Sequence, residues 1–395
     1  MRRPVAIVIA ACAGVLVGAA GMAALDDSPT LDASLARGEA PVAPAPVAEP
    51  TDRTLLVWTA DGLPADLSGR VATLPDVRSS TLVAGDTLPL VASYASDGQP
   101  LDRTPPGEVI PLDALAVDPA TYAPFWDKAA QAQLLALRPG EALLGATSAR
   151  LRRAGPGTVL ELADGARVTV AGVVADQAVG AAEVVVDTAT APALGITTPR
   201  FLLVAYRGER TPLEQQIAPL LPPGASVRYR SRGETPFLRH ADAVLPQALI
   251  KDRFGEFSYT PPTRDRFFTV DPTWRADNIE TRAVPILGKV TCHRAVLPAL
   301  EGALRELEQR NLGFLVDRSG YQGCFQPSVI SENGSISRHS WGVAADLNFS
   351  KNPTGAASAV DPRLVEVMER WGFVSGGDWL IPDPGHFEYL RPPRT

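Results

Sequence analysis

Short apolar runs separated by turn residues fill residues 54–232. In the run 167–174, polar and apolar residues alternate, and this period of two is typical of a half-buried strand. Further strands are predicted at 54–58, 80–84, 183–186 and 201–206, and one helix at 129–137. His, Cys and acidic residues form no cluster in this stretch. We therefore expect a β-rich domain that serves as a spacer or as a protein-contact module.

A helical period replaces the period of two in residues 276–395. One predicted helix carries an apolar stripe of Val296, Leu300, Leu304 and Leu307, and Asn311 and Gly313 end it. A second helix is expected to start at Asp361 and Pro362, with the acid as N-cap and proline at the first helical position. Its inner stripe is Leu364, Met368 and Trp371. Apolar runs at 314–316 and 343–349 predict strands. Short helices with a small antiparallel sheet give an α+β domain.

Residues 233–275 mix Pro, Arg and aromatic residues without clear periodicity. We expect an ordered connection that packs against the last domain. His240 in this segment and His293 beyond it are lone histidines. Hydrogen bonding at the surface or in the core is a better reading of each than metal binding.

The N-terminus predicts export. Arg2 and Arg3 precede 22 uncharged residues, 4–25, which suffice to cross a bilayer core of about 30 Å. We expect an uncleaved membrane anchor at 1–27, with a cleaved signal peptide as the alternative. The positive-inside rule places the rest of the chain outside the cell membrane, and cleavage would make it secreted. Residues 28–53, rich in Ala and Pro, predict a semi-extended linker.

Net charge and the number of cysteines limit the kinds of partner and compartment that fit this protein. The 395-residue chain has a net charge of −7 and no basic run, which argues against nucleic acid as a partner. Cys292 and Cys324 are the only cysteines beyond the predicted anchor. In an oxidising compartment their even number favours a disulfide. Two zinc thiolates are the rival interpretation, which the lack of a Cys-x-x-Cys pair weakens.

Two histidines and two carboxylates are concentrated in residues 339–386. His339, Asp346 and His386 make a three-ligand zinc set that leaves a fourth position for water. On the strand reading, Asp346 shares a face with Ala344, and Gly342 lets the backbone bend behind His339. Asp383, three residues before His386, is then free to act as a catalytic base. Glu388 is a rival base or a partner that orients a ligand histidine.

The same residues carry a family resemblance. Ser337, His339, Gly342, Ala344 and Asp346 match every fixed position of Ser-x-His-x-x-Gly-x-Ala-x-Asp, and the match resembles the signature of VanY-type zinc D-Ala-D-Ala carboxypeptidases. The tail at 376–388 resembles the branch with L-alanyl-D-glutamate endopeptidases, in which an Asp replaces the Glu of Glu-x-x-His. For residues 285–392 the resemblance implies the fold of the hedgehog signalling domain, and zinc on His339, Asp346 and His386. It also implies Asp383 as acid/base and peptidoglycan stem peptides as substrate.

One departure concerns the substrate. The family commonly has Ser-Gly-Tyr-Arg ahead of the metal motif, and this chain has Gln322 after Tyr321. Gln322 lacks the charge that would steady a carboxylate, and Arg318 or Arg338 are the candidates to replace it. We predict substrate contacts at Ser337, Tyr321, Gln322 and Trp341, and the choice between carboxypeptidase and endopeptidase stays open.

Two further interpretations concern partners. The altered motif also allows a non-catalytic wall-binding or sensor protein. Residues 138–174 resemble the extracytoplasmic domain of MacB-type permeases in their turn glycines, so residues 54–232 could contact a membrane protein.

Overall fold

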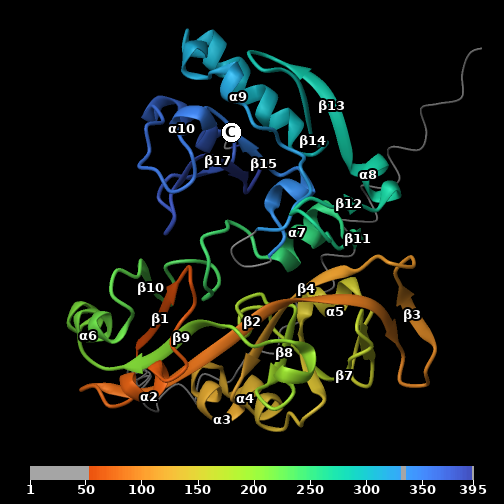
Figure 1. Ribbon diagram of the computed structural model, residues 1–395, viewed down its shortest axis with the longest axis vertical. Coiled ribbons are helices and arrows are strands. Elements are labelled where there is room, and N and C mark those ends of the chain that lie inside the picture. Colours follow the sequence, from red (N-terminus) through yellow and green to blue (C-terminus); the bar gives the residue numbers. More distant parts are fainter. Residues whose placement is uncertain (1–52, 331–334, 394–395) are drawn as a thin grey trace, which may run out of the picture. The chain divides into compact units, whose positions relative to one another are not determined.

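The first part of the described chain is built on one large sheet. The computed structural model describes residues 53–330 and 335–393. Ten described strands join in the order β10-β1-β9-β2-β4-β8-β5-β7-β6, with β3 paired to β2 (Figure 1). The strands are β1 (Arg53–Thr59), β2 (Val77–Tyr94), β3 (Pro100–Arg103), β4 (Ile110–Val117), β5 (Glu141–Gly145), β6 (Val159–Leu162), β7 (Arg167–Val174), β8 (Val184–Asp187), β9 (Pro199–Tyr206) and β10 (Val227–Ser231). All five predicted strands are confirmed.

Strand β2, coloured orange in Figure 1, closes part of this sheet into a barrel. It pairs with β4 at one end of the ring and with β6 at the other. The pairs β4–β8, β8–β5, β5–β7 and β7–β6 complete the circle. Every second residue of these strands points inward, as Leu88 and Leu90 do in β2, and the barrel interior is filled by side chains.

Short helices cover the remaining faces of the sheet. They are α2 (Leu67–Val71), α3 (Pro119–Tyr122), η1 (Ala123–Phe125), α4 (Lys128–Leu135), α5 (Ala146–Leu151), η2 (Ala191–Leu194), α6 (Arg210–Ile217) and η3 (Ala218–Leu220). Helix α4 confirms the helix predicted at 129–137, and the Asp127 carboxylate caps it by accepting the Ala130 N–H at 2.9 Å.

His240 is half-buried against this part of the fold, with its ring stacked 5.2 Å from that of Phe201. Its Nδ1 has no hydrogen-bond partner among the described residues. Burial, reinforced by the positive charges of Arg239, Arg200 and Arg230, lowers the pKa of His240 to about 3. The ring is therefore neutral in the folded protein at ordinary pH.

This depressed pKa predicts acid sensitivity. In the unfolded chain His240 becomes protonated below a pH near 6.5. In the folded protein it becomes protonated only below about pH 3, so between these values only the unfolded state gains the proton. Stability is therefore lost as pH falls through this window, at about 1.4 kcal/mol per pH unit for one proton. His240→Phe keeps the stack on Phe201 and should flatten this slope in urea unfolding measured with a chelator present. Parallel curves for wild type and variant would contradict the prediction.

The second part of the described chain combines helices with three small sheets. Its elements are α7 (Gln247–Phe254), β11 (Tyr259–Thr260), β12 (Thr269–Val270), α8 (Pro272–Asn278), β13 (Ile279–Val284), β14 (Gly288–His293), α9 (Leu297–Gln309), η4 (Gly313–Leu315), η5 (Arg318–Gly320), η6 (Arg338–Trp341), β15 (Ala344–Asp346), η7 (Phe349–Lys351), α10 (Pro362–Arg370), β16 (Phe373–Gly376) and β17 (Asp383–Tyr389). The sheet β15-β17-β16 is antiparallel and carries the site described below. Helices α9 and α10 confirm both predicted helices, and Asp361 caps α10.

Two predicted strands need correction. Residues 314–316 do not form a strand: Gly313–Leu315 is a 3₁₀ turn, and Phe314 is 74% exposed beneath the guanidinium of Arg363. Of the run 343–349, only Ala344–Asp346 is a strand. Asn348 ends it because it adopts a positive φ of 54° and its side chain binds the backbone of Asp317 and Leu315.

The connecting segment contributes directly to the second core. Phe254, Phe257 and Trp274 are buried in the same cluster as α9 and α10. The Phe257 ring lies 4.7 Å from that of Trp341. The segment therefore packs against the last domain, as the sequence predicts.

The predicted anchor at 1–27 and the linker that follows it lie outside the described residues. Within residues 53–330 and 335–393, every helix is too short or too polar to span a bilayer.

Candidate metal centre

Three side chains converge on one point of the small sheet. His339 Nε2 lies 3.2 Å from Asp346 Oδ1 and 3.2 Å from His386 Nδ1. His386 Nδ1 lies 2.9 Å from Asp346 Oδ1. The structure thus brings together the three residues that the sequence predicts as metal ligands. Among the described residues, they form the one group of His, Cys, Asp or Glu side chains close enough to hold a metal ion.

Strand pairing explains two of the three positions. Asp346 of β15 lies directly opposite His386 of β17 in an antiparallel register, so their side chains share one face of the sheet. Glu388 follows His386 by two residues on the same face, opposite Ala344. The small side chain of Ala344 leaves this face free for the larger polar groups.

A 3₁₀ turn positions the third side chain, that of His339. His339 lies in η6, which Ser337 caps by accepting the His339 N–H at 3.3 Å. Gly342 follows with a φ of 66°, where a Cβ would lie 2.6 Å from the backbone nitrogen of His293. Only glycine fits this close approach, and it allows the chain to turn from His339 into β15.

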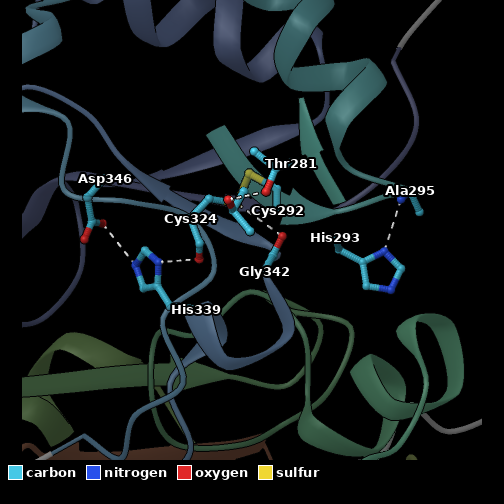
Figure 2. The surroundings of a disulfide bond; sticks show 9 residues. Thr281, Cys292, His293, Ala295, Cys324, His339, Gly342 and Asp346 are labelled. Carbon is cyan, nitrogen blue, oxygen red and sulfur yellow. Dashed lines mark hydrogen bonds and ion pairs between the residues drawn. A yellow bond between two sulfur atoms is a disulfide. The ribbon is translucent and has the colours of Figure 1, made fainter. Parts of the chain in front are cut away.

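Hydrogen bonds on the far sides of both rings fix their tautomers. His339 Nδ1 donates to the carbonyl oxygen of Cys324 at 2.9 Å, and Figure 2 shows the ring lying between this oxygen and Asp346. His386 Nε2 faces Glu388 Oε1 at 3.4 Å. The two nitrogens that face Asp346 therefore both carry lone pairs, and three acceptors that converge in this way need a cation between them.

The spacing of these acceptors fits zinc. Bonds of about 2.0–2.1 Å in tetrahedral geometry place ligand atoms roughly 3.3 Å apart, close to the separations of 2.9–3.2 Å observed here. Two imidazoles and one carboxylate are the ligand types of catalytic zinc sites with an open fourth position. His339, Asp346 and His386 would hold the ion.

Electrostatics favours a positive charge at the same point. Burial would raise the pKa of Asp346, but His339 and His386 outweigh burial when a proton instead of a metal ion occupies their inner nitrogens, and they then hold that pKa well below its usual range. Burial would lower the pKa of His386, yet Asp346 and Glu388 raise it to about 10. In both cases the surroundings stabilise a cation, whether a proton or a metal ion.

Asp383 opens strand β17 beside this cluster. Its pKa is raised, mainly because the carboxyl group is buried and also because Asp346 is negative, while His386 acts in the opposite direction. The Thr354 hydroxyl donates to Asp383 Oδ1 at 3.0 Å and fixes one of its oxygens. A partly buried carboxylate with a raised pKa is suited to accept and return a proton.

The Cys292–Cys324 disulfide fixes the backbone that contacts His339. It joins β14 to the residue whose carbonyl oxygen orients His339 (Figure 2). The predicted disulfide is therefore confirmed, and the zinc thiolate interpretation is not.

Removing the disulfide should destabilise the fold. The bridge closes a loop across 32 residues, for which loop entropy gives at most about 3.7 kcal/mol. We expect the double variant Cys292→Ala/Cys324→Ala to lose a few kcal/mol in denaturant unfolding, with no further change when reductant is added. Wild type should lose a similar amount in reductant. Equal stability of wild type and variant in oxidising buffer would contradict this.

The four residues predicted to contact substrate differ in their exposure and in their contacts. Gln322 is exposed, and its N–H donates to the Asp346 carbonyl oxygen at 3.1 Å. The buried hydroxyl of Tyr321 has no partner among the described residues, and burial together with the charge of Asp346 raises its pKa to about 12. Ser337 caps η6. Trp341 is fully buried, with its indole N–H on the Gly255 carbonyl oxygen, so we assign it to packing instead of substrate contact.

The two candidate arginines both have structural contacts in the fold. Arg338 is half-buried and donates to the carbonyl oxygens of Ile336 and Leu245. The Arg318 guanidinium lies against Gly288, at the turn between β13 and β14. Both guanidinium groups thus have structural neighbours of their own.

Sequence reasoning missed two residues beside the site. Thr354 lies in an irregular loop whose composition gives no signal. Trp379 was visible only as part of the Gly-Gly-Asp-Trp stretch, and its ring lies 5.2 Å from that of His386.

Comparison with known proteins bears on this geometry. Residues 331–389 match the family model described as D-alanyl-D-alanine carboxypeptidase. Residues 331–389 are similar to this family. This confirms the resemblance drawn from the motif at Ser337–Asp346. No curated protein shows significant similarity to the chain.

Solved structures also share features with the chain. The periplasmic region of MacB from Actinobacillus actinomycetemcomitans is 10% identical, with a TM-score of 0.33, over 45% of this chain and 88% of that one. The extracellular domain of the noncanonic ABC-type transporter YknZ from Gram-positive bacteria is 14% identical, with a TM-score of 0.30, over 46% of this chain and 100% of that one. These are proteins of the type that residues 138–174 resemble, and similarity at this level carries no information about activity or partners.

Proposed function

We propose that the chain is a zinc-dependent peptidase that hydrolyses peptide bonds in peptidoglycan stem peptides. The observation that carries the proposal is the convergence of three lone-pair donors, His339 Nε2, Asp346 Oδ1 and His386 Nδ1, within about one zinc coordination sphere. The match of this segment to a D-alanyl-D-alanine carboxypeptidase family supports the substrate class.

The residues divide the work of hydrolysis between them. His339, Asp346 and His386 would hold the zinc ion, which would supply an acidified water and polarise the peptide carbonyl group. Asp383 takes the proton from the attacking water and passes it to the amine of the leaving peptide. Burial supports this role because it raises the pKa of Asp383 towards the range of a proton carrier.

Export is part of the proposal. The disulfide between Cys292 and Cys324 supports an oxidising compartment. We propose that residues 1–27 anchor the chain in the cell membrane, with secretion after cleavage as the alternative. A membrane protein that contacts residues 54–232 stays a prediction.

Metal analysis and a defined digest test the proposal together. The purified chain should contain one zinc per molecule and should release products from defined muropeptides. Loss of a terminal D-Ala identifies a carboxypeptidase, and cleavage between L-Ala and D-Glu identifies an endopeptidase. A chain that binds zinc and muropeptides but leaves every peptide intact would instead be a wall-binding or sensor protein, a reading that the exposed Gln322 in place of an arginine favours.

A further inference from the structure

Residues 241–245 of the connecting segment, here called the strap, reach three places next to the metal cluster. The Asp242 carboxylate accepts the Leu380 N–H. The Val244 N–H donates to Glu388 Oε2 at 2.9 Å. The Leu245 carbonyl oxygen accepts a hydrogen bond from Arg338 at 2.9 Å. Leu380 follows Trp379 in the sequence, Glu388 faces the ring of His386, and Arg338 precedes His339 in the sequence.

Two arginines of strand β10 hold the Asp242 end of the strap. Arg230 Nη2 lies 3.3 Å from Asp242 Oδ1, and Arg228 Nη2 lies 3.8 Å from Oδ2. Arg230 also donates to the carbonyl oxygens of Arg239 and Ala241, at 2.6 and 3.2 Å. Asp242 and Arg230 are only 10% and 11% exposed, so this ion pair is shielded from solvent screening.

The same arginine–aspartate group fixes the loop that carries Trp379. Arg228 Nη2 donates to the Asp378 carbonyl oxygen at 2.8 Å, and Asp242 binds the N–H of Leu380. The backbone is thus tied on both sides of Trp379. Leu380 itself packs against the core of the β-rich part. Trp379, whose ring contacts His386, is therefore positioned by residues of the large sheet.

The middle of the strap acts on His386 through Glu388. Glu388 is 3% exposed, and its two oxygens are used separately, one by the Val244 N–H and one by His386 Nε2. A carboxylate that receives the outer N–H of a ligand histidine sets the ring's orientation and tautomer. The Val244 N–H fixes the rotation of that carboxylate.

We propose that Asp242 is a positioning residue for the metal centre, through which strand β10 of the β-rich part sets the placement of His386 and Trp379. The proposal deepens the proposed function and rests on it for the identity of the ion. It assigns the β-rich part a role in catalysis: the metal site is complete only when the strap is docked on β10.

Zinc affinity of the full chain tests this. Asp242→Asn keeps an acceptor for the Leu380 N–H but removes the charge that pairs with Arg228 and Arg230. We expect the dissociation constant for zinc, measured by competition with a chromophoric chelator, to rise about 10–100-fold. The visible absorption of the cobalt-substituted protein should change as well, because the ligand geometry loosens. Arg228→Gln, at a residue whose side chain is 34% exposed and whose loss spares the core, should shift both readouts in the same direction by less.

Asp252→Asn is the matched control. Asp252 also pairs with an arginine of the β-rich part, Arg150, at 2.7 Å, but on the exposed side of α7. An unchanged zinc affinity and cobalt spectrum in Asp242→Asn would overturn the proposal. An equal loss of affinity in Asp252→Asn would overturn it too, because general loosening would then explain the effect. Zinc affinity can be measured whether or not the chain cleaves peptides. A wild-type chain that binds zinc and cleaves no peptide would refute the proposed peptidase function, and the zinc-affinity test of Asp242 would remain valid.

Discussion

Replacing Asp383 with Asn should strongly slow peptide hydrolysis and leave the zinc site intact. Asparagine has the shape of aspartate and can still contact Thr354, but it cannot take a proton from the attacking water. General acid–base groups contribute about 10²–10⁴-fold to rate, and we expect a fall in kcat of that size with little change in KM. Rates on a defined muropeptide, together with zinc content, measure both parts of the prediction.

Asp378→Asn is the control for this variant. Asp378 lies in the loop before β17, and its side chain is exposed. Its replacement removes the same charge within five residues of Asp383 and should leave kcat within about twofold. Full activity in Asp383→Asn would contradict the role assigned to Asp383. A Glu388→Gln variant that loses activity but keeps its zinc affinity would then identify Glu388 as the base, because Glu388 also orients His386.

The convergence of His339, Asp346 and His386 could be predicted in part because two local signals agree. Asp346 lies in an alternating run, so its side chain must point away from the apolar side, and strand pairing then places it opposite His386. Gly342 signals the bend that His339 needs. These signals depend on neighbours within a few residues, which is the range over which a sequence pattern constrains a backbone.

Trp341 shows where such local reasoning fails. It lies two residues from His339 and was predicted to contact substrate. In the 3₁₀ turn of η6, however, successive side chains point in directions about 120° apart. His339 faces the cluster, whereas Trp341 faces the core against Phe257. Proximity along the chain does not give direction unless the type of turn is known.

The barrel was also beyond the sequence pattern. Only residues 80–84 of β2 were predicted, because Gly85, Asp86 and Pro89 read as turn residues. Pro89 lies opposite Pro111 in β4, and a pair of prolines can occupy only a position that needs no ladder hydrogen bond. The strand therefore continues through Pro89 to Tyr94, where it pairs with β6 and closes the ring.

Lys251 should be among the most sensitive positions for stability. It is one of four lysines in the chain, yet its side chain is fully buried. Its Nζ lies 2.9 Å from Glu183 Oε1 and 3.2 Å from Glu256 Oε2, and Arg152 pairs with both glutamates. Four charges of balanced sign thus join α7 to the β-rich part. The pKa of Glu256 is lowered because Arg152 and Lys251 outweigh the effect of burial.

Lys251→Met should therefore lower the free energy of unfolding by about 3–5 kcal/mol, because it leaves two buried carboxylates with one cation. Adding Glu183→Gln should recover part of this loss, since the double variant restores the charge balance. Glu161→Gln is the control: its pair with Arg167 is solvent-exposed, and we expect at most about 1 kcal/mol. Urea unfolding of five proteins measures this: wild type, Lys251→Met, Glu183→Gln, the double variant and the Glu161→Gln control. Additive losses in the double variant would show that Lys251 and Glu183 act independently, and the cluster would then be no coupled unit.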